Sequence, residues 1–141
     1  MRKSILVTGG TKGIGRAIIE RFAKEGFDIY TCARNEGDLL ALKKSLEEKY
    51  PEIKVLAIAA DLSKKEEVNS FADKVKSMVI PDILVNNAAQ GIHTPPQDTS
   101  LEEWNRVIGT SLTGYFLNAR EFARLVIPAK KPAAKKAAKS E

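Results

Sequence analysis

The sequence predicts an α/β fold, in which helices cover both faces of a parallel sheet. Short apolar runs alternate with segments whose apolar residues recur every three or four positions. Four glycines follow the first apolar run closely, in the stretch VTGGTKGIG from Val7 to Gly15. A composition of 43% hydrophobic and 29% charged residues is typical of a globular domain, and no apolar run approaches the roughly 20 residues of a membrane span.

Strands and helices are expected to alternate along most of the chain. The apolar runs at residues 4–8, 27–33, 53–60 and 82–89 are predicted strands. Helical spacing begins at Ile14 and recurs at residues 39–50, 63–78 and 101 to about 127, and Pro51 ends the second of these helices. Ser63 followed by Glu66 indicates a capping box for the third helix. Right-handed crossovers then predict a doubly wound sheet of about four strands in the order 3-2-1-4.

We divide the chain into a domain at residues 1–128 and a tail at 129–141. The segment PAKKPAAKKAAKSE has no large apolar residue and is predicted to be disordered. Its lysines carry most of the net charge of +5, so nucleic-acid binding by the tail is a hypothesis, which the nearly neutral remainder of the chain disfavours. Cys32 is the only cysteine, and the N-terminus does not resemble a secretory signal, so we expect a cytoplasmic protein.

The glycine-rich stretch favours a phosphate site. A strand that ends at glycine and leads into a helix presents free backbone N–H groups and the positive end of the helix dipole. Gly9 and Gly10 suit the tight turn, whereas Gly13 and Gly15 lack a Cβ where a pyrophosphate and the neighbouring strand would approach. The spacing differs from the common G-x-G-x-x-G, and a structural loop without a ligand is the alternative.

Three motifs together resemble the short-chain dehydrogenase/reductase family, whose fold is of the Rossmann type. TGGTKGIG (8–15) is similar to the family's TGxxxGxG turn, NNAA (86–89) to its NNAG, and AADLS (59–63) to its adenine-binding segment. The resemblance covers Lys3 to about Pro128. It implies that Asp61 holds the adenine amino group with Leu62 beside it, and that the cofactor also contacts Gly9, Thr11, Lys12, Gly13, Ile14, Gly15, Asn87, Ala88 and Ala89.

Two cations indicate which nicotinamide cofactor is preferred. Arg34 follows the second strand, where NAD-preferring relatives have an acidic residue for the ribose hydroxyls. Lys12 matches a second basic position of NADP-preferring relatives. Two cations suit a 2′-phosphate, so the predicted cofactor is NADP(H).

The catalytic residues that the resemblance implies are not found in this sequence. Ser111 stands where the family has asparagine, and the serine, tyrosine and lysine that follow in the family have no counterpart before Glu141. Tyr50 and Lys54 have the YxxxK spacing, but Pro51 separates them, and we interpret the spacing as a coincidence. His93 has no metal-ligating neighbour in sequence, so no metal site is predicted.

The sequence therefore predicts the NADP(H)-binding portion of a truncated oxidoreductase that transfers hydride between nicotinamide and a small carbonyl or alcohol, inactive alone. A non-catalytic dinucleotide-binding or interaction module is the alternative. Self-association is expected through the last helix or the exposed fourth strand. Gly109 and Gly114 in that helix indicate a close contact, either between two copies or within one, and we interpret Trp104 as a core residue.

Overall fold

The computed structural model describes residues 1–127; the predicted tail at 129–141 lies outside the described residues. The described chain forms a parallel four-stranded sheet in the order β3-β2-β1-β4, which confirms the predicted topology. In register, Leu6 lies between Tyr30 and Leu84, and Tyr30 pairs in turn with Leu56. The strands are β1 (Ser4–Thr8), β2 (Asp28–Ala33), β3 (Val55–Ala59) and β4 (Ile83–Val85).

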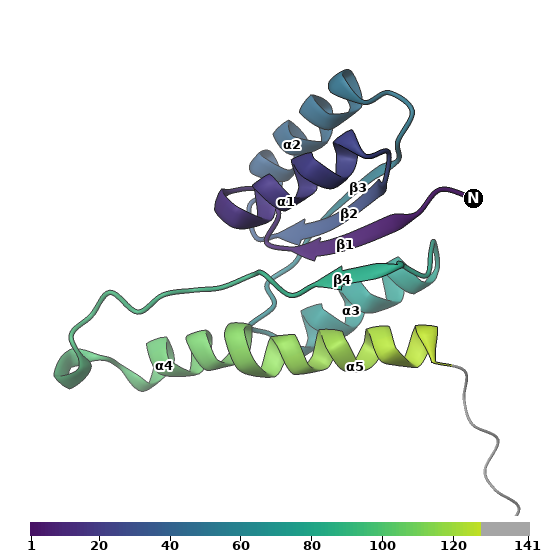
Figure 1. Ribbon diagram of the computed structural model, residues 1–141. Coiled ribbons are helices and arrows are strands. Elements are labelled where there is room, and N and C mark those ends of the chain that lie inside the picture. The colour runs from purple at the N-terminus through teal and green to yellow at the C-terminus, as the bar shows by residue number, and fades with distance from the viewer. Residues whose placement is uncertain (128–141) are drawn as a thin grey trace, which may run out of the picture.

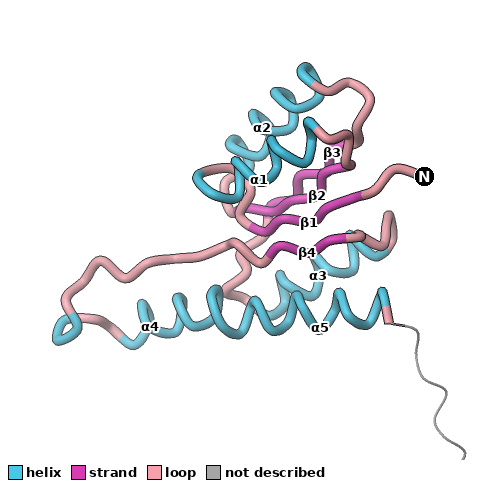
Figure 2. The backbone as a smooth tube through the Cα atoms, viewed as in Figure 1, coloured by secondary structure: helices cyan, strands magenta, loops and turns pink. Residues whose placement is uncertain are grey.

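Helices cover both faces of the sheet (Figure 1). α1 (Gly13–Lys24) and α2 (Glu36–Lys49) lie on one face. α3 (Lys65–Lys76) and a long rod lie on the other, and the rod consists of α4 (Leu101–Ile108), a π-helical turn (Gly109–Thr113) and α5 (Gly114–Val126). A short 3-10 turn (Pro96–Asp98) precedes this rod, at the end of the extended loop visible in Figure 2. None of the helices within residues 1–127 combines the length and the apolar character needed to cross a bilayer.

The two faces of the sheet build separate cores. Alternate residues of a strand point to opposite faces, so Ile5 and Val7 pack with residues of α1 and α2, whereas Leu6 packs with residues of α3 and α5. All three side chains are buried. The apolar runs that predicted strands are therefore runs buried on both faces, as expected of a parallel sheet.

β4 is shorter than the predicted strand at 82–89, because the residues after Val85 bond to a side chain instead of to a neighbouring strand. The hydroxyl oxygen of Thr8 accepts the N–H groups of Asn87 at 3.0 Å and Ala88 at 3.1 Å. These bonds draw the chain across the end of β1. They turn the predicted end of the strand into the wall of a pocket.

The last helix is interrupted at the π-helical turn, where two glycines pack against the loop that follows β3. A Cβ on Gly109 would lie 2.9 Å from the carbonyl oxygen of Ser63, and a Cβ on Gly114 would lie 2.8 Å from that of Leu62. Both distances are too short for a side chain. The close contact predicted for these glycines is therefore made within the chain.

Two local predictions are wrong. Trp104 is 54% exposed, because α4 extends beyond the carboxyl ends of the strands, where the sheet offers it no surface to pack against (Figure 1). α3 begins at Lys65 without a side-chain cap, and the Ser63 hydroxyl donates instead to the carboxylate of Asp61 at 2.7 Å. A capping box lies instead at the start of α4, where Ser100 and Glu103 bond each other's backbone N–H groups.

Candidate functional site

A cavity of about 660 Å³ lies at the carboxyl end of the sheet, beside the glycine turn after β1. Its walls come from that turn, from the ends of β2 and β3, and from the segment after β4. Parallel strands end at the same edge, so residues far apart in sequence meet there. The predicted cofactor-binding residues that line the cavity are Gly9, Thr11, Lys12, Arg34, Asp61, Leu62, Asn87, Ala88 and Ala89.

The turn after β1 needs glycine at its first position. Gly9 has a φ of +70°, and a Cβ there would lie 2.8 Å from the Cα of Ala88. Its N–H donates to the carbonyl oxygen of Cys32 at 2.8 Å, which ties the turn to the end of β2. Bare backbone is therefore required both by the conformation and by the approach of the segment after β4.

Gly13, Ile14 and Gly15 form the first turn of α1 and, within the described chain, are not among the residues that line the cavity. Gly13 has a φ of +56° and an open surface. Gly15 is buried, and a Cβ on it would collide with the carbonyl oxygen of Gly9 and the amide nitrogen of Asn87. Gly15 thus allows α1 to start directly against the end of β1.

The start of α1 has no side-chain cap among the described residues, because Lys12 occupies the N-cap position and makes no such bond. α2 differs, since its N-cap Asn35 accepts the N–H of Asp38 at 2.9 Å. Uncapped N–H groups at a helix start, together with the helix dipole, form a favourable environment for an anion. α1 presents such an environment next to the cavity.

Lys12 and Arg34, predicted to act together, line the same cavity. The Lys12 ammonium lies 3.0 Å from a carboxylate oxygen of Asp38, a residue in the first turn of α2. Arg34 is exposed at the end of β2, and its positive charge reaches Asp61. The cavity therefore combines two cations with the uncapped helix start.

Asp61 lines the cavity from a tight hydrogen-bonded turn. One oxygen of its carboxylate accepts the N–H of Ser63 at 3.0 Å and the Ser63 hydroxyl at 2.7 Å, and the other lies 3.9 Å from the Lys64 ammonium. Burial alone would raise the pKa of this carboxyl, but the Ser63 hydrogen bonds and the charges of Lys64 and Arg34 outweigh it and lower the pKa. The carboxylate is ionised at neutral pH and can accept a hydrogen bond from an amino group.

The two asparagines after β4 bond backbone across the edge of the sheet. The amide nitrogen of Asn87 donates to the carbonyl oxygens of Thr8 and Gly9, both at 3.1 Å, and that of Asn86 donates to the carbonyl oxygen of Tyr115 in α5 at 3.1 Å. They hold the segment that brings Asn87, Ala88 and Ala89 into the cavity wall against both β1 and α5. Thr8, which was not predicted as a site residue, is the shared partner of this segment.

Two polar atoms in the cavity wall have no hydrogen-bond partner within residues 1–127. These atoms are the Gln90 side-chain oxygen and the Thr110 hydroxyl, and Thr110 is 5% exposed. Buried polar groups are nearly always satisfied in folded proteins, so a ligand with polar groups fits this wall. Asn35 and Asp38 also line the cavity. Sequence reasoning missed these four residues, since only the fold brings the loop after β4 and the helix starts together.

The wall also includes Cys32, the single cysteine. Burial raises the pKa of its thiol to about 12, although a hydrogen bond from the Gly9 backbone acts in the opposite direction. The thiol is therefore protonated and unreactive at neutral pH.

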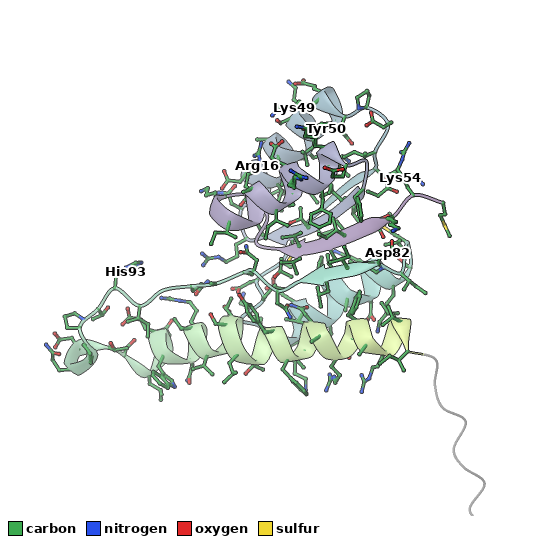
Figure 3. The ribbon with its side chains drawn as sticks, in the orientation of Figure 1. Arg16, Lys49, Tyr50, Lys54, Asp82 and His93 are labelled. Atoms are coloured by element: carbon green, nitrogen blue, oxygen red, sulfur yellow. The ribbon has the colours of Figure 1, made fainter. Side chains whose placement is uncertain are left out.

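The residues considered for catalysis or metal binding lie elsewhere. Tyr50 directly follows α2 and Lys54 directly precedes β3, so this pair is at the amino end of the sheet, away from the cavity (Figure 3). Ser111 is half-buried in the π-helical turn. His93 is exposed in the loop after β4, and residues 1–127 contain no cluster of three or more side chains able to hold a metal ion.

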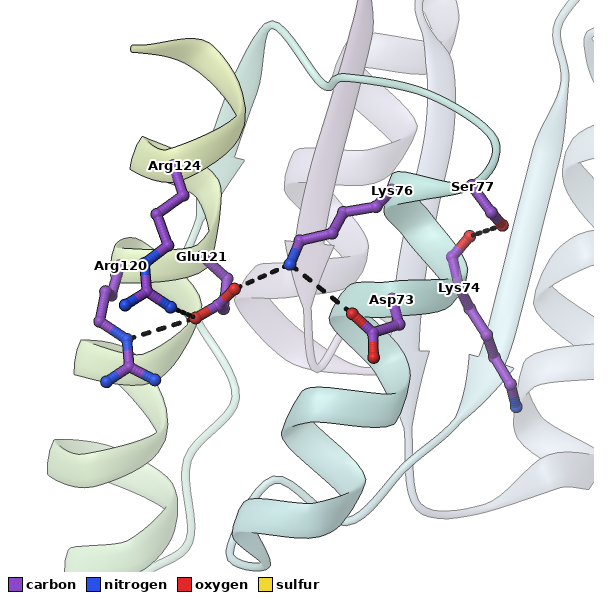
Figure 4. A network of polar contacts seen from close by, with 7 residues as sticks. All are labelled: Asp73, Lys74, Lys76, Ser77, Arg120, Glu121 and Arg124. Atoms are coloured by element: carbon purple, nitrogen blue, oxygen red, sulfur yellow. Dashed lines mark hydrogen bonds and ion pairs between the residues drawn. The ribbon is translucent and has the colours of Figure 1, made fainter. Parts of the chain in front are cut away.

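An ion-pair network below the sheet fixes the rod that carries Thr110. The carboxylate of Glu121 in α5 accepts from Lys76 of α3 at 2.8 Å, from Arg124 at 2.7 Å and from Arg120 at 3.3 Å (Figure 4). The hydrogen bond from Lys76 is the main cause of the lowered pKa of Glu121. The network holds α5 against α3. The contacts of Gly109 and Gly114 with the loop after β3 hold the rod at a second point.

Known proteins resemble this chain in both sequence and structure. The family model for short chain dehydrogenases matches residues 3–135. Glucose 1-dehydrogenase 2 of Bacillus subtilis is 36% identical over 84% of this chain and 46% of its own length. L-sorbose reductase of Gluconobacter frateurii, solved with NADPH and L-sorbose, superposes with a TM-score of 0.78 at 34% identity, covering 86% of this chain and 46% of the reductase.

A short-chain dehydrogenase of Sphingobium yanoikuyae, solved with NADPH, gives a TM-score of 0.80 at 28% identity over 86% of this chain and 47% of its own. The chain thus spans about half the length of each of these relatives. The family match covers most of the chain and agrees with the sheet order and the glycine turn. This chain belongs to the short chain dehydrogenase family.

Proposed function

We propose that this chain is the NADP(H)-binding portion of an oxidoreductase. The observation that carries the proposal is the shared cavity of Lys12 and Arg34 beside the uncapped start of α1. The helix start suits the diphosphate and the two cations suit a 2′-phosphate. The Asp61 carboxylate can accept the adenine amino group, and the partnerless Thr110 hydroxyl and Gln90 oxygen, among the described residues, fit a ligand rich in polar groups.

The similar structures support this choice of cofactor. Those of Sphingobium yanoikuyae and Gluconobacter frateurii were solved with NADPH, and the second also holds L-sorbose. A bound nicotinamide supplies hydride transfer, so the reaction class that we propose is reduction of a carbonyl or oxidation of an alcohol. The residues of this chain would bind and orient the dinucleotide.

A calorimetric titration with NADPH and NADH tests the proposal. We expect saturable binding of NADPH at one site, about tenfold or more tighter than binding of NADH, because only NADPH offers a phosphate to both cations. Equal affinity for the two cofactors would refute the NADP preference. Absence of binding to either would refute the dinucleotide site itself.

We further propose that residues 1–141 have no dehydrogenase activity by themselves. Ser111 replaces the asparagine of the family, and Tyr50 and Lys54 lie at the wrong end of the sheet. NADPH oxidation in the presence of a panel of aldehydes and ketones tests this statement. Turnover by the purified chain would contradict it, whereas turnover restored by a separately supplied second half of a relative would identify the chain as one part of an enzyme.

The substitution at Ser111 also favours a second candidate, a dinucleotide-binding or interaction module without turnover. Serine has one hydroxyl and cannot offer the donors and the acceptor of an amide together. NADPH binding without activity, even in the presence of a complementary half, would support this candidate. A Ser111→Asn variant sharpens the test, since gain of activity in the complemented pair favours the enzyme.

Self-association is proposed through the outer side of the rod formed by α4 and α5. Large apolar side chains there are exposed, among them Trp104 at 54%, Leu112 at 64% and Phe116 at 60%. Several exposed apolar side chains on one rod favour contact with another apolar surface. Sedimentation of the wild type and of Phe116→Glu tests the proposal, which predicts a dimer for the first and a monomer for the second.

We also place the chain in the cytoplasm, where a free thiol such as Cys32 stays reduced.

A further inference from the structure

We propose that Asp38 tunes the cofactor preference by competing with the 2′-phosphate for Lys12. The inference rests on the proposed function and concerns a residue that sequence reasoning did not select. Asp38 lines the cavity together with Lys12 and Arg34, and its carboxylate is 3.0 Å from the Lys12 ammonium. A carboxylate and a phosphate are alternative partners for the same cation.

The position of Asp38 is fixed by its helix. Asp38 belongs to the first turn of α2, where the side chain of Asn35 accepts its N–H at 2.9 Å. The backbone is therefore held, and the carboxylate contacts Lys12 at the start of α1. The ion pair therefore joins the start of α1 to the first turn of α2, at the cavity wall.

The exposure of the Lys12–Asp38 ion pair determines whether the 2′-phosphate can replace the Asp38 carboxylate as the partner of Lys12. The Lys12 side chain is 79% exposed and that of Asp38 is 35% exposed, and ion pairs this accessible contribute little to stability. A phosphate of nearly two negative charges can therefore displace the carboxylate. The displaced carboxylate stays on the same short helix turn, so its charge opposes the phosphate and reduces the benefit of the two cations.

This competition is specific to the phosphorylated cofactor. NADH has a 2′-hydroxyl where NADPH has the 2′-phosphate, so it has no phosphate there to bind the Lys12 ammonium. The charge of Asp38 should therefore affect NADH binding only weakly. Neutralising Asp38 should thus strengthen NADPH binding and widen the preference for NADPH. If the carboxylate instead held Lys12 in place for the phosphate, neutralising it would weaken NADPH binding.

Glu36 provides a matched control. It lies in the same first turn of α2 and carries the same charge as Asp38. Within residues 1–127 it is neither in the cavity wall nor in an ion pair. A general change in the electrostatic field of the helix start would appear in Glu36→Gln as much as in Asp38→Asn. Competition for Lys12 would appear in Asp38→Asn alone.

The experiment measures dissociation constants for NADPH and NADH by calorimetry in wild type, Asp38→Asn, Glu36→Gln, Lys12→Met and the double variant Lys12→Met/Asp38→Asn. We expect Asp38→Asn to tighten NADPH about three- to tenfold and to change NADH less than twofold. Glu36→Gln should show no such gain. In the Lys12→Met background, where only the repulsion between Asp38 and the phosphate remains, the gain should be smaller, and an undiminished gain would contradict the competition. Weaker or unchanged NADPH binding in Asp38→Asn, or an equal gain for NADH, overturns the inference while the wild-type preference for NADPH still stands. A wild type without that preference overturns the proposed function, and the inference with it.

Discussion

The two ends of the sheet differ in how fully their polar groups are paired. At the amino end, carboxylates accept the backbone N–H groups of the strand starts: Asp28 accepts the N–H of Lys54 at 2.8 Å, and Asp82 accepts that of Ser4 at 2.7 Å. At the carboxyl end, the start of α1 has no side-chain cap within the described residues, and Thr110 and Gln90 keep polar atoms without partners.

This difference assigns stability of the fold mainly to the amino end of the sheet and ligand binding mainly to the carboxyl end. Internal hydrogen bonds at the amino end stabilise the strand starts and leave few free groups for a ligand. The carboxyl end keeps donors and acceptors free and surrounds them with the cations Lys12 and Arg34. We therefore expect substitutions at the amino end to change the free energy of unfolding and substitutions at the carboxyl end to change affinity, with the glycine turn affecting both.

The largest effect is expected from Gly9→Ala at the carboxyl end of the sheet, which we call the open end because its polar groups are partly unpaired; the amino end is called the closed end. The φ of +70° disfavours alanine, and the new Cβ would lie 2.8 Å from the Cα of Ala88. We expect the free energy of unfolding to fall by about 2–4 kcal/mol and NADPH binding to be lost. Urea unfolding and calorimetry measure the two quantities.

Gly26→Ala is the control for this substitution. Gly26 has a φ of +82°, but a Cβ added there would meet no atom of the described residues within 4 Å, so this variant carries the conformational cost alone. We expect a loss of about 1–2 kcal/mol with unchanged affinity for NADPH. Equal losses in the two variants would show that the contact with Ala88 is unimportant.

The sequence predicted the sheet order because apolar runs, glycines and right-handed crossovers leave little choice of topology. It also identified the glycine turn and the two cations, because their residue types are distinctive. It failed at Ser63 and Trp104, where the outcome depended on a neighbouring turn and on how far α4 extends past the sheet. It also missed Asp38, whose ion pair with Lys12 depends on the approach of α2 to α1 and leaves no local signal.

The next largest effect is expected at the closed end. Asp28 is 8% exposed, and Asp28→Ala would leave the N–H of Lys54 without its acceptor. We expect a loss of about 1–3 kcal/mol in the free energy of unfolding, with the dissociation constant for NADPH unchanged. Weakened NADPH binding in a folded variant would contradict the proposed separation of the two ends.

Lys12→Met and Arg34→Met test the open end without disturbing the fold. Both side chains are exposed, so we expect the free energy of unfolding to change by less than about 0.5 kcal/mol. Each variant should weaken NADPH binding by about tenfold and leave NADH binding nearly unchanged. A matched exposed lysine on α2, Lys44→Met, serves as the control, since Lys44 pairs only with Glu48 in the described structure and lies outside the cavity wall. Loss of NADH affinity equal to that of NADPH would assign the two cations to the diphosphate instead.

The smallest effect is expected from the pH dependence of Asp61, which belongs to the open end but also stabilises its own turn. Burial acts to raise its pKa in the folded chain, but the Ser63 hydrogen bonds and nearby cations outweigh burial and lower the pKa. A carboxyl with a lowered folded pKa contributes stability above its unfolded pKa of about 3.9, and this contribution is lost as the pH falls through the folded pKa. The difference in unfolding free energy between wild type and Asp61→Asn should thus be constant between about pH 6 and 8 and shrink below about pH 4. Urea unfolding at a series of pH values measures it, and a difference that grew on acidification would show that the charged form is not the one stabilised by the fold.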